Sequence, residues 1–270
     1  MPLTKLLENF IHHLSQQPEV LAILCYGSYA EGTQDEHSDI DILVLCDNAI
    51  MDVKKRQLIY DKSGVHHQQL HKAIENWETS WTPVNDEFKL NNIKVEVGYN
   101  DTIWVHSLIS DLMQKGSTTL SYFEFRPYTF LGLLENALCF YEKDQFFTHL
   151  KSSIRPYPAK LKQNIIQENM SIMDEGVADL EDCMKRDIGF LASQFYLFRA
   201  FDAAVQILFA INEVYYPASK REERHVLGLK LLPPRFEEFM NELPTFYSKK
   251  AEILEYIKEI QDYIKRTITH

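Results

Sequence analysis

A short apolar run, residues 20–26, ends at Gly27 and Ser28, and this pair has the residue types that bind a phosphate. Glycine adopts backbone angles that other residues avoid, and it lets a ligand approach the chain closely. The Ser28 hydroxyl and the backbone N–H groups around it can donate hydrogen bonds to phosphate oxygens. The pair therefore predicts a phosphate-binding turn at the end of a buried strand.

Two carboxylates, Asp39 and Asp41, stand at the start of a second run that alternates as far as Cys46. Alternate side chains of a strand point to the same face, so the two carboxylates project together, roughly 7 Å apart. Oxygen ligands of this kind suit Mg²⁺, which takes one or two carboxylates together with phosphate oxygens. Because two such charges side by side are costly unless a cation shares them, the pair predicts a metal site.

A third carboxylate, Glu96, lies between Val95 and Val97 in another alternating run and shares its face of the strand with Lys94. If this strand lies beside the one that carries the aspartates, Glu96 joins them around one metal. Three acids that hold two cations about 3.5–4 Å apart can carry out in-line displacement at phosphorus. The three carboxylates are therefore the candidate catalytic and metal-binding residues.

The elements that position these residues fall into two parts. Apolar residues at helical spacing predict a helix over 3–17, followed by the strands already described. The segment 137–141 fits either a strand or a short buried helix. A proline-rich linker begins at Arg155, and beyond it the pattern is helical almost to the end. We therefore predict an α+β protein, with a small mixed-sheet domain over 1–154 and an all-α helical domain over 155–270.

The order strand, Gly27-Ser28, loop, Asp39-x-Asp41, strand, with Glu96 on a later strand, resembles the nucleotidyltransferase fold of the DNA polymerase beta superfamily. The resemblance implies a catalytic domain over 1–154, followed by a helical substrate-binding domain. It implies transfer of a nucleoside monophosphate, AMP from ATP by default although another nucleoside triphosphate would also serve. Two Mg²⁺ ions would be held by Asp39, Asp41 and Glu96.

The domain order and length look like those of the aminoglycoside and lincosamide nucleotidyltransferases. The second half also resembles uncharacterised bacterial nucleotidyltransferase-like proteins, through Arg186-Asp187, a long Phe-rich helix and the stretch from Asn212 to Lys220. The resemblance implies a small hydroxyl-bearing acceptor, an antibiotic-resistance activity, and a monomer or homodimer. Two alternatives stay open: a protein- or tRNA-modifying enzyme of a toxin–antitoxin type, and a non-catalytic nucleotide-binding regulator.

The phosphate-binding loop departs from the commoner pattern of the superfamily. Many relatives carry an arginine after the Gly-Ser pair or before the second glycine of the loop, where this chain has Tyr29 and Glu31. The loop therefore lacks a cation for the triphosphate. Lys220 is the candidate for that charge, by resemblance and by physical need, and a solvated lysine in a basic turn is the alternative.

Composition excludes several classes of protein. Hydrophobic residues make up 45% and charged residues 25% of the 270 residues, which excludes wholesale disorder. The net charge of −11 makes general nucleic-acid binding a poor fit. Residues 1–150 hold 11 Lys and Arg against 21 Asp and Glu, a net charge of −10, which suits a metal or a cationic acceptor as well as a plain acidic surface. The four cysteines form no C-x-x-C pair, and no long apolar run stands at the N-terminus, so we expect a cytoplasmic protein without a membrane span.

Two further patterns have plainer interpretations. His66, His67 and His71 could include a zinc-binding pair at helical spacing, but no matching acid completes a motif, which favours a surface cluster. The Phe-rich stripe from Phe190 to Phe201 is predicted to belong to the core of the helical domain.

Overall fold

The computed structural model divides into two compact units, Met1–Pro156 and Tyr157–His270, and each is described by itself. The roles predicted for the two domains, catalysis in 1–154 and substrate binding in 155–270, stay predictions. The histidine cluster at 66, 67 and 71 lies outside the described residues. The structure describes residues 5–65, 68–70, 81–119, 126–246 and 248–269.

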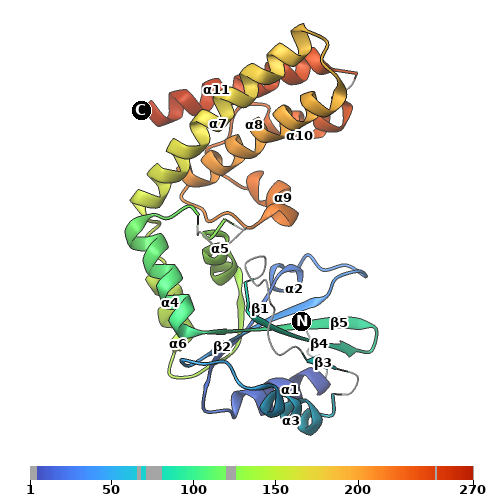
Figure 1. Ribbon diagram of the computed structural model, residues 1–270, viewed down its shortest axis with the longest axis vertical. Helices are drawn as coiled ribbons and strands as arrows, with labels where there is room; N and C mark the ends of the chain where they lie inside the picture. Colours follow the sequence, from blue (N-terminus) through green and yellow to red (C-terminus); the bar gives the residue numbers. More distant parts are fainter. Residues whose placement is uncertain (1–4, 66–67, 71–80, 120–125, 247, 270) are drawn as a thin grey trace. The chain divides into compact units, whose positions relative to one another are not determined.

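The first unit is built on a six-stranded mixed sheet with the strand order β3-β4-β5-β2-β1-β6 (Figure 1). β2 and β5 run parallel at its centre, and the other neighbouring strands pair antiparallel. A mixed sheet followed by helices confirms the predicted α+β class. The strands are β1 Val20–Tyr26, β2 Ile40–Cys46, β3 Gln69–Leu70, β4 Val84–Leu90, β5 Ile93–Asp101 and β6 Leu138–Glu142.

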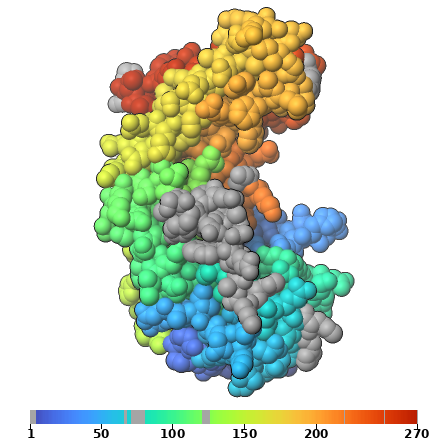
Figure 2. All heavy atoms as spheres, viewed as in Figure 1, coloured from blue at the N-terminus to red at the C-terminus, as the bar shows by residue number. Residues whose placement is uncertain are grey.

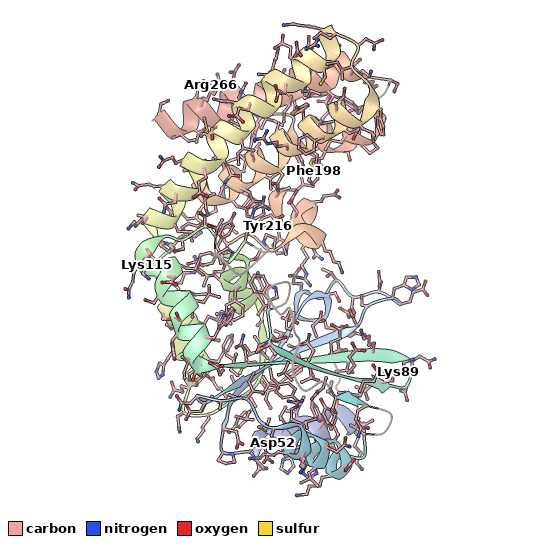
Figure 3. The ribbon with its side chains drawn as sticks, viewed as in Figure 1. Asp52, Lys89, Lys115, Phe198, Tyr216 and Arg266 are labelled. Atoms are coloured by element: carbon pink, nitrogen blue, oxygen red, sulfur yellow. The ribbon has the colours of Figure 1, made fainter. Side chains whose placement is uncertain are left out.

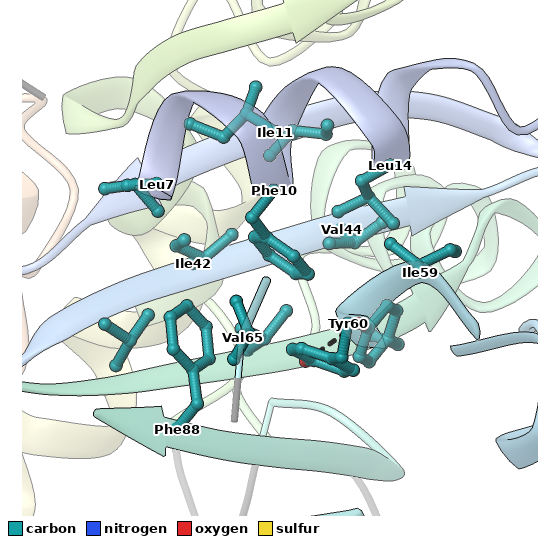
Figure 4. Packing of buried hydrophobic residues seen from close by; sticks show 14 of the residues in the cluster. Leu7, Phe10, Ile11, Leu14, Ile42, Val44, Ile59, Tyr60, Val65 and Phe88 are labelled. Carbon is teal, nitrogen blue, oxygen red and sulfur yellow. Dashed lines mark hydrogen bonds between the residues drawn. The ribbon is translucent and has the colours of Figure 1, made fainter. Parts of the chain in front are cut away.

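Helices α1 (Lys5–Ser15) and α3 (Val53–Ser63) cover one face of this sheet (Figure 4). Phe10 of α1 is fully buried, as are Ile42 and Val44 on the facing side of β2. Burial of each such side chain stabilises the fold by about 1.5–3 kcal/mol relative to leaving it in water. This packing buries the face of β2 that carries Ile42 and Val44. The side chains at the alternate positions of β2 therefore point to the opposite face of the sheet.

The remaining helices in the described part of the first unit are short. The segment that the sequence left open between strand and helix is β6, which pairs with β1 at one edge of the sheet. The loop between α2 and β2, blue in Figure 2, projects from the surface of the unit, with Glu36 and His37 almost fully exposed. The short helices of the first unit that the structure describes are α2 Ser28–Glu31, α4 Thr102–Ser110 with its π-helical continuation η2 Asp111–Lys115, α5 Thr129–Asn136 and α6 Phe146–Ser153.

The second unit is helical, and its two longest helices, α7 and α8, pack along each other (Figure 1). Gly176 of α7 allows the close approach, because a Cβ there would lie 3.0 Å from the Cβ of Ala200 on α8. Asn212, just beyond α8, joins the returning chain through hydrogen bonds with both the N–H and the C=O of Leu231. The elements are α7 Ala159–Lys185, α8 Phe190–Ile211, η3 Ser219–Arg221, α9 Glu222–Val226, α10 Phe236–Glu242, η4 Leu243–Thr245 and α11 Lys250–Thr269.

Helix α8 is only partly a core helix. Its second half is buried, but Phe190, Leu191, Phe195 and Phe198 are 44%, 80%, 61% and 71% exposed. The prediction that the Phe stripe from Phe190 to Phe201 belongs to the core is therefore wrong for Phe190, Phe195 and Phe198, and it is confirmed for Phe201, which is 6% exposed. By length and hydropathy alone, α8 is long and apolar enough to cross a membrane. However, 67% of the 18-residue apolar segment that meets these criteria is buried inside the structure, as in a core helix.

Candidate active site

Three carboxylates converge where β2 and β5 lie side by side. Asp41 is the direct register partner of Glu96 in the parallel β2–β5 pair, and Asp39 stands immediately before β2. Each of the three side chains offers an oxygen, and these oxygens all lie within 4.8 Å of one another. The condition stated above for Glu96, that its strand should lie beside the aspartates, is met.

The convergence follows from the alternation of the two strands. Val95 and Val97 are fully buried on the helix-covered face, as are the isoleucines and Val44 of β2 on the same side. Because successive side chains of a strand alternate between faces, Asp41 and Glu96 must point to the other face. There they are half-buried, which leaves their oxygens accessible to an ion and its water ligands.

The Gly27-Ser28 turn adjoins the same end of the sheet. Tyr26, the last residue of β1, is the register partner of Asp41, so the turn follows directly beside the carboxylates. Gly27 has φ +77° and ψ −156°, a conformation that a residue with a Cβ adopts only with strain. Its carbonyl accepts hydrogen bonds from the N–H groups of Ala30 and Glu31, which closes the turn into α2. A glycine is therefore required here for the chain to turn at this point.

The carboxylates fit a divalent cation of the magnesium kind. Hard cations bind oxygen ligands, and Mg²⁺ is held in proteins by few carboxylates and keeps the remainder of its shell for water or phosphate. Three anionic oxygens this close repel one another, and a shared cation removes that cost. The donor set and its accessibility thus agree with the metal predicted from the sequence.

A lysine that the sequence analysis did not assign to the site lies against it. The ammonium of Lys94 contacts Oε1 of Glu96 and lies 3.4 Å from Oε1 of Glu87 on β4. Its hydrogen bond to Glu96 raises the pKa of Lys94, and the neighbouring negative charges add to the rise. The signal was present in the sequence, since Lys94 and Glu96 share one face of a strand, but the contribution of Glu87 depends on the β4–β5 pairing.

Lys220, the lysine predicted to reach the triphosphate, lies exposed on η3 in the second unit. Its role, like the roles of the carboxylates and of the Gly27-Ser28 turn, stays a prediction.

Comparison with known proteins supports a nucleotidyltransferase domain in the first unit. Residues 8–92 match the family described as "Polymerase beta, Nucleotidyltransferase", a span that includes Gly27, Ser28, Asp39 and Asp41. The chain therefore carries a nucleotidyltransferase domain of the DNA polymerase beta superfamily, which confirms the resemblance drawn from the motif.

The later part of the chain has a different match. Residues 126–221 match a "Domain of unknown function (DUF4037)", which begins in the first unit and ends in the second. The structure of a nucleotidyltransferase-like protein from Exiguobacterium sibiricum 255-15 is similar at a TM-score of 0.45 and 9% sequence identity, over 97% of this chain and 73% of that chain. None of the curated proteins matches this chain significantly.

Proposed function

We propose that the protein transfers a nucleoside monophosphate, AMP from ATP by default, to a hydroxyl group of a small molecule and releases pyrophosphate. The observation that carries the proposal is the convergence of Asp39, Asp41 and Glu96 beside the Gly27-Ser28 turn. A protein that kept this fold without binding metal would have no need for three mutually repelling carboxylates at this point.

Each residue would have a separate task in this reaction. Gly27 and Ser28 would bind the β- and γ-phosphates, and Lys220 would supply positive charge to the triphosphate. Asp39, Asp41 and Glu96 would hold the divalent cations, two by analogy with the superfamily. Bound there, such cations stabilise the leaving pyrophosphate and lower the pKa of the acceptor hydroxyl.

The bond changes balance without a further reactant. The acceptor oxygen forms a bond to the α-phosphorus as the bond between that phosphorus and the bridging oxygen of pyrophosphate breaks. Glu96 would accept the hydroxyl proton, provided it lies within hydrogen-bond reach of the acceptor. Catalysis would then rest on positioning and on charge stabilisation at phosphorus.

The charge of the chain supports a cationic acceptor, such as an aminoglycoside, before a neutral one. Residues 1–150 carry the net charge of −10, and a surface of one sign raises the local concentration of ligands of the other sign. Lincosamides remain the second class of acceptor to test. We also propose that the protein acts in the cytoplasm, since its four cysteines are free thiols.

The test is ATP binding by calorimetry with and without Mg²⁺, on the wild type and on Asp39→Asn/Asp41→Asn. We expect Mg²⁺-dependent binding that the double variant weakens about 100-fold or more, since even supporting partners of metal ligands contribute 10–100-fold to affinity. Asp47→Asn is the matched control, because Asp47 is an exposed carboxylate just beyond the other end of β2. Equal binding by the double variant and the control would refute the assignment of the metal site.

Turnover then separates the alternatives. Pyrophosphate release with an aminoglycoside or lincosamide supports the proposal. Release only with a protein or tRNA acceptor supports an enzyme of the toxin–antitoxin type. Nucleotide binding without release in the presence of any acceptor supports a non-catalytic regulator.

A further inference from the structure

A row of like charges crosses the sheet at the carboxylate site. Asp41, Glu96 and Glu87 stand in register on the three adjacent strands β2, β5 and β4. Lys94, two residues before Glu96 on β5, lies on the same face as Glu96 and contacts both glutamates. The Lys94 ammonium thus forms ion pairs with two carboxylates, Glu87 and Glu96, and Glu96 belongs to the candidate metal site.

The contact to Glu96 has a consequence for a metal. The ammonium binds Oε1 of Glu96, and the grouping with Asp39 and Asp41 requires one ligand oxygen from each residue. A cation bound to these three residues and an ammonium bound to Glu96 would place two positive groups a few ångströms apart, which costs free energy. Metal and ammonium would therefore disfavour each other at Glu96, although each could bind a different oxygen of its carboxylate.

We propose that Lys94 is a built-in counter-ion of the site, which neutralises Glu96 before metal binds and moves wholly onto Glu87 when it does. The proposal rests on the metal binding contained in the proposed function. Glu87 is already 3.4 Å from the ammonium, so the shift from one glutamate to the other is small. The flexible four-carbon stem of a lysine allows such a movement, and about 41% of the Lys94 side chain is exposed.

Two roles follow for these residues, and neither makes them catalytic. Lys94 would reduce the repulsion between the carboxylates in the metal-free protein. It would also set the metal concentration at which the site becomes occupied. Glu87 would be a positioning residue that acts on the site only through Lys94.

The test is Mn²⁺ binding to the full chain, measured by calorimetry without nucleotide. Lys94→Met should bind Mn²⁺ about tenfold more tightly than the wild type, equivalent to about 1.4 kcal/mol. Lys94→Arg keeps the positive charge and should stay near the wild type. Lys89→Met is the matched control: it removes an exposed positive charge at the register partner of Lys94 on β4 (Figure 3) and leaves Lys94, Glu87 and Glu96 in place. It should therefore change the affinity by less than about twofold.

A double-variant cycle separates displacement from general electrostatics. Glu87→Gln removes the alternative partner of Lys94 and should weaken Mn²⁺ binding in the wild-type background. In the Lys94→Met background the same change should have little effect, because its action passes through the ammonium. Equal effects of Glu87→Gln in both backgrounds would overturn the proposal.

The outcomes also distinguish this proposal from the proposed function. Wild-type binding that Asp41→Asn abolishes, with no gain in Lys94→Met, overturns the role of Lys94 and leaves the metal site standing. Binding by Lys94→Met where the wild type shows none supports the counter-ion. Absence of Mn²⁺ binding in the wild type and in Lys94→Met overturns both proposals.

Discussion

Arg56→Met should destabilise the first unit by about 3–5 kcal/mol, because it leaves a buried carboxylate without its cation. Arg56 on α3 and Asp86 on β4 form an ion pair with 2.9 Å between Nε and Oδ2, and the two side chains are 1% and 0% exposed. Tyr60 of α3 also donates to Oδ2 of Asp86 over 3.3 Å, and burial raises the pKa of Tyr60 well above its ordinary value. The pair thus joins α3 to the strand that adjoins the strand of Glu96.

Urea unfolding followed by tryptophan fluorescence measures this effect selectively. All three tryptophans, residues 77, 81 and 104, belong to the first unit, so the signal reports that unit alone. With a slope of about 2 kcal/mol per molar urea, the predicted loss shifts the midpoint downward by about 1.5–2.5 M. Loss of a surface ion pair has a much smaller effect, about 0–1 kcal/mol.

A control and a double variant complete the experiment. Lys115→Met removes the cation of an ion pair with Asp111 in which the lysine side chain is 70% exposed (Lys115 is labelled in Figure 3), and it should shift the midpoint by less than about 0.5 M. Arg56→Met/Asp86→Leu removes both charges and should be more stable than Arg56→Met alone, since no buried charge then lacks a counter-ion. A loss below about 1 kcal/mol in Arg56→Met, similar to that of the control, would refute the reasoning.

Two further predictions concern the second unit. Gly176→Leu should cost about 1–3 kcal/mol by overpacking against Ala200, measured by thermal unfolding followed by circular dichroism; an unchanged melting temperature would contradict the close helix packing. Hydrogen bonds led by that from Arg235 lower the pKa of Glu238 from 4.5 to about 2, so the ionised form is favoured in the folded state. The resulting stabilisation is present above pH 4.5 and is lost as the pH falls towards 2. Glu238→Gln should therefore melt with a weaker pH dependence over pH 2–5 than the wild type or the exposed neighbour variant Glu237→Gln, and equal slopes would count against the assignment.

The candidate site could be predicted almost completely from local patterns. Gly27, Asp39 and Asp41 stand in one short stretch, and the alternation of each strand assigns every carboxylate to a face without knowledge of the fold. Glu96 is distant in the sequence, and its place was predicted only on the condition that two strands are neighbours. The parallel register of Asp41 with Glu96 meets that condition.

Strand β4 shows why the rest could not be predicted. Its buried positions alternate, but one of them is Asp86, and a charge at a core position breaks the apolar pattern by which strands are recognised. The charge is tolerated because Arg56, thirty residues earlier, neutralises it inside the unit. With β4 missed, Glu87 was missed as well, and with it the second partner of Lys94.

Residue types and short spacings alone predict the chemistry available to this protein: a glycine turn that suits phosphate, carboxylates at the strand positions that face away from the core, and helical periodicity beyond the linker. These features follow from residue types and from spacings of a few residues, which local geometry controls. Which charged side chains meet depends on strand order, register or helix packing, as three pairs show: Asp41 with Glu96, Lys94 with Glu87, and Arg56 with Asp86. Tertiary packing likewise left Phe190, Leu191, Phe195 and Phe198 of α8 exposed, because an apolar pattern shows that a face can be buried and not whether another element covers it.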